Sequence, residues 1–242
     1  MLVVDIETIP DLKDEVYVNY KSSALMRKGL SKAETIESHK KEVIRDKFAL
    51  SPLTGKLICG GFLSDMQLPE APLTEHTVLN KAGEDTLLYY DAILSDNELG
   101  LLVDTLHTIQ RYLDNGHRIV TYNGNDFDIP FIVRRAIFNN LECPANFPTL
   151  DNLTNKYRPQ YHLDLKMVLN PSYAEQQRSG KLSEWAYLLG ATSDLGGNGG
   201  EVYEQYLTKD FDGIKNHCIA DIVKTYFIYQ AIKSWVSIHE YI

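Results

Sequence analysis

Two acidic residues near the start of the chain, Asp5 and Glu7, have the types and spacing that metal-dependent chemistry requires. They are separated by one residue in a stretch rich in Leu and Val that is typical of a buried strand, and alternate residues of a strand point to the same face. Neighbouring carboxylates repel each other and stay ionised at little cost only where a cation neutralises them. Hard divalent ions such as Mg²⁺ or Mn²⁺ take oxygen ligands of this kind. The pair is a candidate metal site, although two solvated acids are the simpler interpretation.

A second polar group lies midway along the chain, between Tyr122 and Phe131. Its sequence predicts a junction between a strand and a helix, where a rigid scaffold commonly holds functional residues. Asp128 lies just before a helix opened by Pro130, so its simplest role is to cap that helix. Asp126 could be the acid at the helix start instead, and the local sequence does not separate the two.

A third group, His217 and Asp221, falls in the last predicted helix. Residues four apart share a helix face, so the imidazole and the carboxylate should be neighbours. Ile214, Ile222 and Tyr226 are expected to face the core nearby. A surface ion pair is the simpler interpretation of this His–Asp pair, so none of the three groups identifies a catalytic site by itself.

The elements that must position these residues follow from hydrophobic periodicity and from turn signals. Strands interleaved with helices predict an α/β protein in which helices pack on a mixed sheet. We find no internal repeat and no domain linker, so we expect a single domain over residues 1–242. The predicted strands span 1–7, 55–63, 75–79 and 118–122, and a loop is expected at 196–200. The first predicted helix runs from a Ser31–Glu34 capping box to about Phe48, and the second carries Leu102 to Leu113 and is closed by Asn115 and Gly116. The remaining three are a helix opened by Pro130, a helix capped by Ser183 and stopped by Gly190, and a helix over 211–236.

The charge of the chain is unevenly distributed. The formal net charge is −9, which is unlike the basic footprint of most nucleic-acid binders, but residues 21–56 hold nine Lys or Arg against four acids. That segment is therefore +5 and the remainder is −14, so a local basic surface could meet a phosphate backbone. A solvated charged helix explains the same pattern equally well.

Several classes of protein are excluded or disfavoured by composition. No apolar run approaches the ~20 residues that span a membrane, and the acidic start of the chain does not read as a signal peptide. The three cysteines form no Cys-x-x-Cys pair, which argues against a disulfide scaffold or a structural zinc site and indicates a reducing cytoplasm.

Taken in order, the three groups resemble the DEDD superfamily of 3′–5′ exonucleases. They look most like the predicted exonuclease family akin to the proofreading domain of family-B DNA polymerases. The resemblance rests on Asp-x-Glu in the first strand, Asn-x-x-x-Phe-Asp midway, and a His or Tyr four residues before a last Asp. Further matching segments are Tyr157-Arg158, His162-Leu-Asp164-Leu, the run from Lys181 to Gly190, and the Gly-rich loop before Glu201-Val-Tyr203.

The resemblance implies a ribonuclease H-like fold, with a basic helical insert at about 14–50 that the family pattern does not contain. It implies that Asp5, Glu7, Asp128 and Asp221 bind two divalent ions, Mg²⁺ or Mn²⁺, and its Asn-x-x-x-Phe-Asp spacing selects Asp128 over Asp126. One departure concerns His217, because the family usually has Tyr four residues before the last Asp. The His subgroup of the superfamily places its His five residues before that Asp, where this chain has Asn216.

The activity implied by the resemblance is two-metal hydrolysis of phosphodiester bonds at the 3′ ends of single-stranded nucleic acid, with DNA favoured over RNA. His217 would accept the proton of the attacking water. Thr8, Tyr122, Asn123 and Phe127 are candidates for binding the terminal nucleotides, although core packing is the simpler role of Phe127. Asp164 would touch the substrate or merely cap a helix. A separate polymerase or another replication or repair protein is a conceivable partner, and a membrane is not.

Two alternatives remain open at this point. A catalytically silent nucleic-acid-binding module would keep the fold and the basic segment without needing the acids. A phosphohydrolase of the haloacid dehalogenase type also begins with a strand ending in Asp, but it requires a second Asp where this chain has Glu7.

Overall fold

The computed structural model describes residues 1–11, 48–71, 73–79, 83–157, 159–170, 180–190 and 199–236. Most of the basic segment at 14–50, including the Ser31–Glu34 capping box, therefore lies outside the described residues, and so does most of the Gly-rich stretch at 196–200. Within the described ranges, no helix combines the length and the apolar character that crossing a membrane requires.

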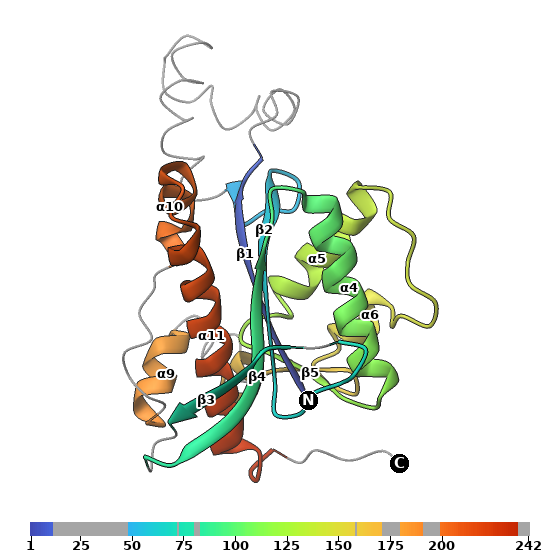
Figure 1. The fold of residues 1–242 in the computed structure, drawn as a ribbon. Coiled ribbons are helices and arrows are strands. Elements are labelled where there is room, and N and C mark those ends of the chain that lie inside the picture. The colour runs from blue at the N-terminus through green and yellow to red at the C-terminus, as the bar shows by residue number, and fades with distance from the viewer. Residues whose placement is uncertain are drawn as a thin grey trace, which may run out of the picture.

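A mixed six-stranded sheet forms the centre of the molecule, with strand order β3-β4-β2-β1-β5-β6 (Figure 1). Strand β1 pairs antiparallel with β2 and parallel with β5. Strands β2, β4 and β3 are antiparallel neighbours, and β5 and β6 are parallel. The strands are β1 (Leu2–Pro10), β2 (Gly55–Ser64), β3 (Glu75–Leu79), β4 (Asp85–Leu94), β5 (Ile119–Thr121) and β6 (His162–Asp164).

Helices cover both faces of this sheet (Figure 1). One face carries α4 (Glu98–Asp114) and α5 (Asp128–Phe138), and the other carries α9 (Leu182–Leu188), α10 (Val202–Thr208) and α11 (Phe211–Ile232). Shorter helical segments are α6 (Leu150–Leu153), α7 (Leu165–Leu169) and the 3₁₀ turn η3 (Gly199–Glu201). The α/β architecture expected from the sequence is confirmed.

The boundaries of two predicted helices need correction. Helix α9 begins at Leu182, so Ser183 lies inside the helix and does not cap it. The cap position is Lys181, whose N–H donates to the Glu184 carboxylate at 2.8 Å. Helix α11 ends at Ile232 rather than at 236. The predicted stop at Gly190 is consistent with the left-handed φ of 70° at that residue.

Strand β1 separates the two halves of the core. Val4 and Ile6 pack in the cluster that includes α4 and α5, and Val3 packs in the cluster that includes α11. Because side chains alternate along a strand, Asp5 and Glu7 lie on the α11 face with Val3. The apolar residues of β1 thus fix which face carries the two acids.

A buried arginine ties the two helices of the α4–α5 face to the sheet. Arg135 of α5 is 1% exposed, and its Nε donates to the Glu98 carboxylate of α4 at 2.7 Å. Arg135 also donates to the Pro52 carbonyl at 3.0 Å and lies 3.5 Å from the Asp11 carboxylate, just after β1. Glu98 in turn accepts the Leu57 N–H of β2 at 2.8 Å, so four parts of the fold meet at one guanidinium group.

Helix α11 approaches the sheet closely at a glycine. Gly61 of β2 lies opposite Asp5, and a Cβ built at Gly61 would come within 2.6 Å of the Cys218 sulfur of α11. No real Cβ contact is that short, so a side chain at position 61 would move the helix or the cysteine. The absence of a side chain here lets α11 reach β1.

We therefore expect Gly61→Ala to destabilise the protein by about 1–3 kcal/mol, as overpacking of a core does. Adding Cys218→Ala removes the atom that the new methyl group meets, so most of this loss should be recovered in the double variant. Urea unfolding of the parent, both single variants and the double variant measures the coupling. An equal cost of Gly61→Ala in both backgrounds would show that the helix is not held off by this contact.

Candidate active site

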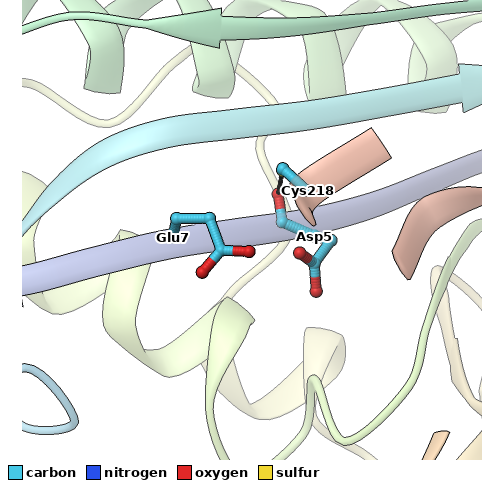
Figure 2. A group of neighbouring side chains, drawn as sticks. All are labelled: Asp5, Glu7 and Cys218. Carbon is cyan, nitrogen blue, oxygen red and sulfur yellow. Dashed lines mark hydrogen bonds between the residues drawn. The ribbon is translucent and has the colours of Figure 1, made fainter. Parts of the chain in front are cut away.

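Asp5 and Glu7 lie on the face of β1 that α11 covers, and Figure 2 shows their side chains on this strand near Cys218 of α11. In the pairing of β1 with β2, Asp5 lies opposite Gly61 and Glu7 opposite Cys59. The register shifts directly after Glu7, between Glu7 and Thr8. Glu7 is only 7% exposed and Asp5 is half-buried, so the two are not freely solvated acids.

Asp128 contacts strand β1 just beyond the point where the pairing of β1 with β5 ends. Strand β5 pairs with Leu2 and Val3 of β1, and among the described residues no strand pairs with β1 beyond Val3 on that side. The Asp128 carboxylate accepts the Ile6 N–H there at 3.2 Å. Asp128 is the first residue of α5 and not its cap, and Asp126 is exposed. The structure therefore places Asp128, and not Asp126, beside the two acids of β1.

Helix α11 supplies the third group. The Nε2 atom of His217 lies 3.4 Å from a Glu7 carboxylate oxygen and 3.8 Å from Oδ2 of Asp221. The other oxygen of Asp221, Oδ1, accepts from Nζ of Lys224 at 2.8 Å. His217 is 6% exposed, so it is not the surface ion pair that its spacing also permits. Within the described part of the chain, Nδ1 of His217 is buried and has no hydrogen-bond partner.

The gathered carboxylates change one another's protonation. Burial is the largest cause that raises the pKa of Asp5 and of Glu7 well above the usual range, and the charges of the neighbouring acids raise both further. Burial also raises the pKa of Asp128 to about 7, against the lowering effect of its backbone hydrogen bonds. Burial lowers the pKa of His217, and the nearby Lys224 lowers it further against the opposing effect of Asp221. Asp5, Glu7 and Asp128 therefore keep their protons to a higher pH than solvated carboxyl groups do.

Cys218 lies next to these acids on α11. Ligand atoms of Asp5, Glu7 and Cys218 are within 4.8 Å of one another, and Figure 2 shows Cys218 beside the backbone of Asp5, whose carbonyl accepts from Sγ at 3.8 Å. A hydrogen bond to Cys59 and burial raise the pKa of the Cys218 thiol. Because the protonated thiol is a poor ligand for hard ions, the carboxylates are the expected metal ligands.

The loop that leads to Asp128 is fastened by a second buried acid. Asp164, at the end of β6, accepts the backbone N–H groups of Asn123 and Asn125 at 2.9 Å each. It also caps α7 by accepting the Lys166 N–H at 2.9 Å. Of the two roles expected from the sequence, the structure supports capping for Asp164, and it adds the loop contacts. The acid thus fixes the path of the chain into Asp128.

The four residues predicted to bind nucleotides all have internal contacts. Thr8 donates to the Ala49 carbonyl at 2.7 Å, and the Tyr122 hydroxyl donates to the Gly180 carbonyl at 2.7 Å. The side-chain carbonyl of Asn123, a residue with a φ of 73°, accepts from Lys166. Phe127 packs against the core with its ring 5.5 Å from that of Phe131. Tyr122, Asn123 and Phe127 lie on the loop between β5 and Asp128, and Thr8 follows the two acids on β1.

Sequence reasoning missed Lys224 as part of this site. The signal was present, because Lys224 is three residues after Asp221 and seven after His217, a spacing that places all three on one helix face. Asp164 was noticed only as an extra acid, and nothing in its local sequence indicates the loop that it holds.

A protein-family model matches more than half of the chain. Residues 91–237 match the family described as a predicted 3′–5′ exonuclease related to the exonuclease domain of PolB. The matched region contains Asp128, His217 and Asp221 and begins after Asp5 and Glu7.

Two DNA polymerases are similar to parts of the chain. The catalytic subunit of DNA polymerase epsilon from Schizosaccharomyces pombe is 30% identical over 118 residues, which cover 46% of this chain and 5% of that protein. The family B DNA polymerase of the hyperthermophilic archaeon Pyrobaculum calidifontis superposes with a TM-score of 0.56 at 13% identity, covering 96% of this chain and 24% of the polymerase.

The chain therefore spans a small fraction of the length of either relative. The structural likeness confirms the ribonuclease H-like fold that the sequence predicted. With the family match over residues 91–237, it follows that the chain belongs to the family of predicted 3′–5′ exonucleases related to the exonuclease domain of PolB.

Proposed function

We propose that the protein is a two-metal-dependent exonuclease that hydrolyses phosphodiester bonds at the 3′ end of single-stranded nucleic acid, with DNA favoured. The observation that carries the proposal is the meeting of Glu7, His217 and Asp221, with Nε2 of the imidazole 3.4 Å and 3.8 Å from the two carboxylates. Asp128 comes from a distant segment of the sequence and reaches β1 at Ile6, next to Asp5.

The donor set fits hard divalent ions. Its oxygens come from carboxylates, and burial and neighbouring acids raise the pKa of three of them, Asp5, Glu7 and Asp128, a condition that a cation relieves. Asp5, Glu7, Asp128 and Asp221 would hold the ions. When bound, such ions lower the pKa of a water molecule and neutralise charge on the phosphate oxygens.

His217 is the group on this chain that would take the proton of the attacking water. Its lowered pKa keeps the imidazole neutral near pH 7 and able to accept a proton at Nε2. A phenol at this position would titrate near ~10 and could only orient the water. The buried Nδ1 would retain the proton that a neutral ring carries on its other nitrogen.

The substrate preference is inferred from the relatives and from the loop before Asp128. Both similar proteins are DNA polymerases by name, which favours DNA and makes a separate polymerase a conceivable partner. Tyr122, Asn123 and Phe127 on that loop, with Thr8 on β1, would shape the binding site of the terminal nucleotides. The ribonuclease H-like fold leaves the haloacid dehalogenase alternative without structural support.

The first test is degradation of single-stranded DNA and RNA oligonucleotides labelled at either end, with Mg²⁺, Mn²⁺ or EDTA. We expect a metal-dependent ladder that shortens from the 3′ end, and a loss of at least about 100-fold in Asp5→Asn and in Asp221→Asn, because each removes a metal ligand. Asp126→Asn is the matched control, since it neutralises an exposed acid of the Asp128 loop. It should retain full activity.

Two results would contradict the proposal. Binding of oligonucleotides without degradation under any metal would identify a silent binding module. Equal activity of the parent, Asp5→Asn and Asp221→Asn would place the chemistry at other residues or in a contaminant.

The raised pKa values also predict how the stability of the protein depends on pH. In the unfolded chain the acids lose their protons near pH 4, whereas folded Asp128 keeps its proton up to about pH 7. The folded state therefore binds more protons, and the stability contributed by Asp5, Glu7 and Asp128 is present at low pH and lost as the pH rises through the folded pKa values. His217 has the opposite effect on stability because its pKa is lowered. Below about pH 6.5 the unfolded chain binds one proton at this residue more readily than the folded protein does, so its contribution to stability increases as the pH rises.

In EDTA, the melting temperature should fall between pH 6 and pH 8. The stabilisation by Mg²⁺ or Mn²⁺ should grow over the same range, because the ion must displace protons from its ligands. Thermal unfolding at each pH with and without metal measures both trends, and Asp128→Asn should flatten the EDTA profile. A metal stabilisation that is the same at pH 6 and pH 8 would argue against binding at these acids.

A further inference from the structure

Lys224 is a buried cation at the edge of the carboxylate group. It is 7% exposed, and its Nζ donates to Oδ1 of Asp221 at 2.8 Å. The other oxygen of Asp221 faces Nε2 of His217 at 3.8 Å. Asp221 is thus held by a lysine of its own helix through one oxygen, while its other oxygen faces the histidine.

The pairing has an energetic reason on both sides. A buried ammonium group is costly unless an opposite charge and hydrogen bonds compensate it, and Asp221 provides both. Asp221 is the partner with which Lys224 forms its ion pair in the described part of the chain. Asp221 in turn contributes to raising the pKa of Asp5 and of Glu7, so Lys224 neutralises one of four acids that repel one another.

We propose that Lys224 is a positioning residue that serves as the internal counter-ion of Asp221 in the metal-free site and thereby weakens the affinity of the site for a divalent ion. The inference rests on the proposed function, because it assumes that Asp221 is a metal ligand. It extends that function by naming a residue that sets how tightly the metal binds.

The direction of the effect follows from charge. An ion that binds Asp221 must displace the ammonium group or share the carboxylate with it. A unit positive charge about 6 Å from a divalent ion lowers its affinity about tenfold even with the screening of bulk water. The lysine also holds the carboxylate so that Oδ2 points toward His217, which keeps a ligand oriented in the absence of metal.

The test is Mn²⁺ binding at pH 8, measured by titration with electron paramagnetic resonance and by calorimetry on the full chain. We expect Lys224→Met, which keeps the length of the side chain without its charge, to bind Mn²⁺ about tenfold more tightly than the parent. Lys224→Arg should keep the parent's affinity because it keeps the charge. Lys215→Met makes the same change in net charge on the same helix, but two residues from His217 and hence on another side, and it should leave the affinity unchanged.

Two outcomes separate this inference from the proposed function. No Mn²⁺ binding to the parent, with an unfolding transition that metal does not shift, would overturn the metal site and the inference with it. Binding to the parent with equal or weaker binding to Lys224→Met would overturn the inference alone.

A second measurement does not depend on the folding of the variant. In the parent protein, the side-chain NMR signal of Lys224 should shift on addition of Mg²⁺, because its partner changes, while that of Lys215 should not. An unchanged Lys224 signal at saturating Mg²⁺ would also overturn the inference.

Discussion

Repulsion among buried and half-buried acids that lie close together is the constraint on which the rest of this structure depends. Asp5 and Glu7 stand on one face of a central strand, and Asp128 and Asp221 are close enough to raise the pKa of both. Such a group is costly in any fold, because burial penalises each charge and neighbouring charges penalise one another. The chain nevertheless gathers the acids from three segments that lie far apart in the sequence. Under the proposed function, bound cations would relieve this repulsion.

The backbone of the sheet creates the place where these acids meet. Strand β5 leaves β1 after Val3, and the Asp128 carboxylate then takes the hydrogen bond from Ile6 that a longer β5 would have made. On the opposite side, Gly61 lets α11 come close enough for Cys218 to touch the Asp5 backbone. The short β5 thus leaves backbone of β1 available to Asp128, and the absence of a side chain at Gly61 lets α11, which carries Asp221, approach the face of β1 that holds Asp5 and Glu7.

Much of this could be predicted from the sequence, for reasons that are local. Asp5 and Glu7 lie on one face because side chains alternate along a strand, and His217 and Asp221 lie close together because residues four apart share a helix face. Strand β4 was missed because its residues are mostly half-buried and do not alternate between apolar and polar. Pairing with β2 and β3 on both sides makes it a strand, and such tertiary contacts cannot be inferred from the segment alone.

The site was harder to derive than the fold. The choice between Asp126 and Asp128 depends on which side chain reaches Ile6, a contact across 122 residues. The role of Asp164 depends likewise on a loop that arrives from a different strand. Lys224 was accessible to helix periodicity, but a lysine three residues after an aspartate is usually a solvent-exposed pair, and only its burial distinguishes it here.

The contacts at the end of β1 have a consequence for how this fold can vary. Asp11 donates its N–H to the Thr54 carbonyl at 2.7 Å, Thr8 holds Ala49, and Thr54 holds Phe48. Both ends of the segment between Asp11 and Phe48 are therefore fastened to each other beside Glu7, with Arg135 bound next to them. Closing a loop across a fixed gap costs only about 0.6 kcal/mol more for each doubling of its length. The number of residues between these two anchors can accordingly change during evolution while the sheet and its acids keep their places, and any sequence inserted there begins and ends close to Glu7.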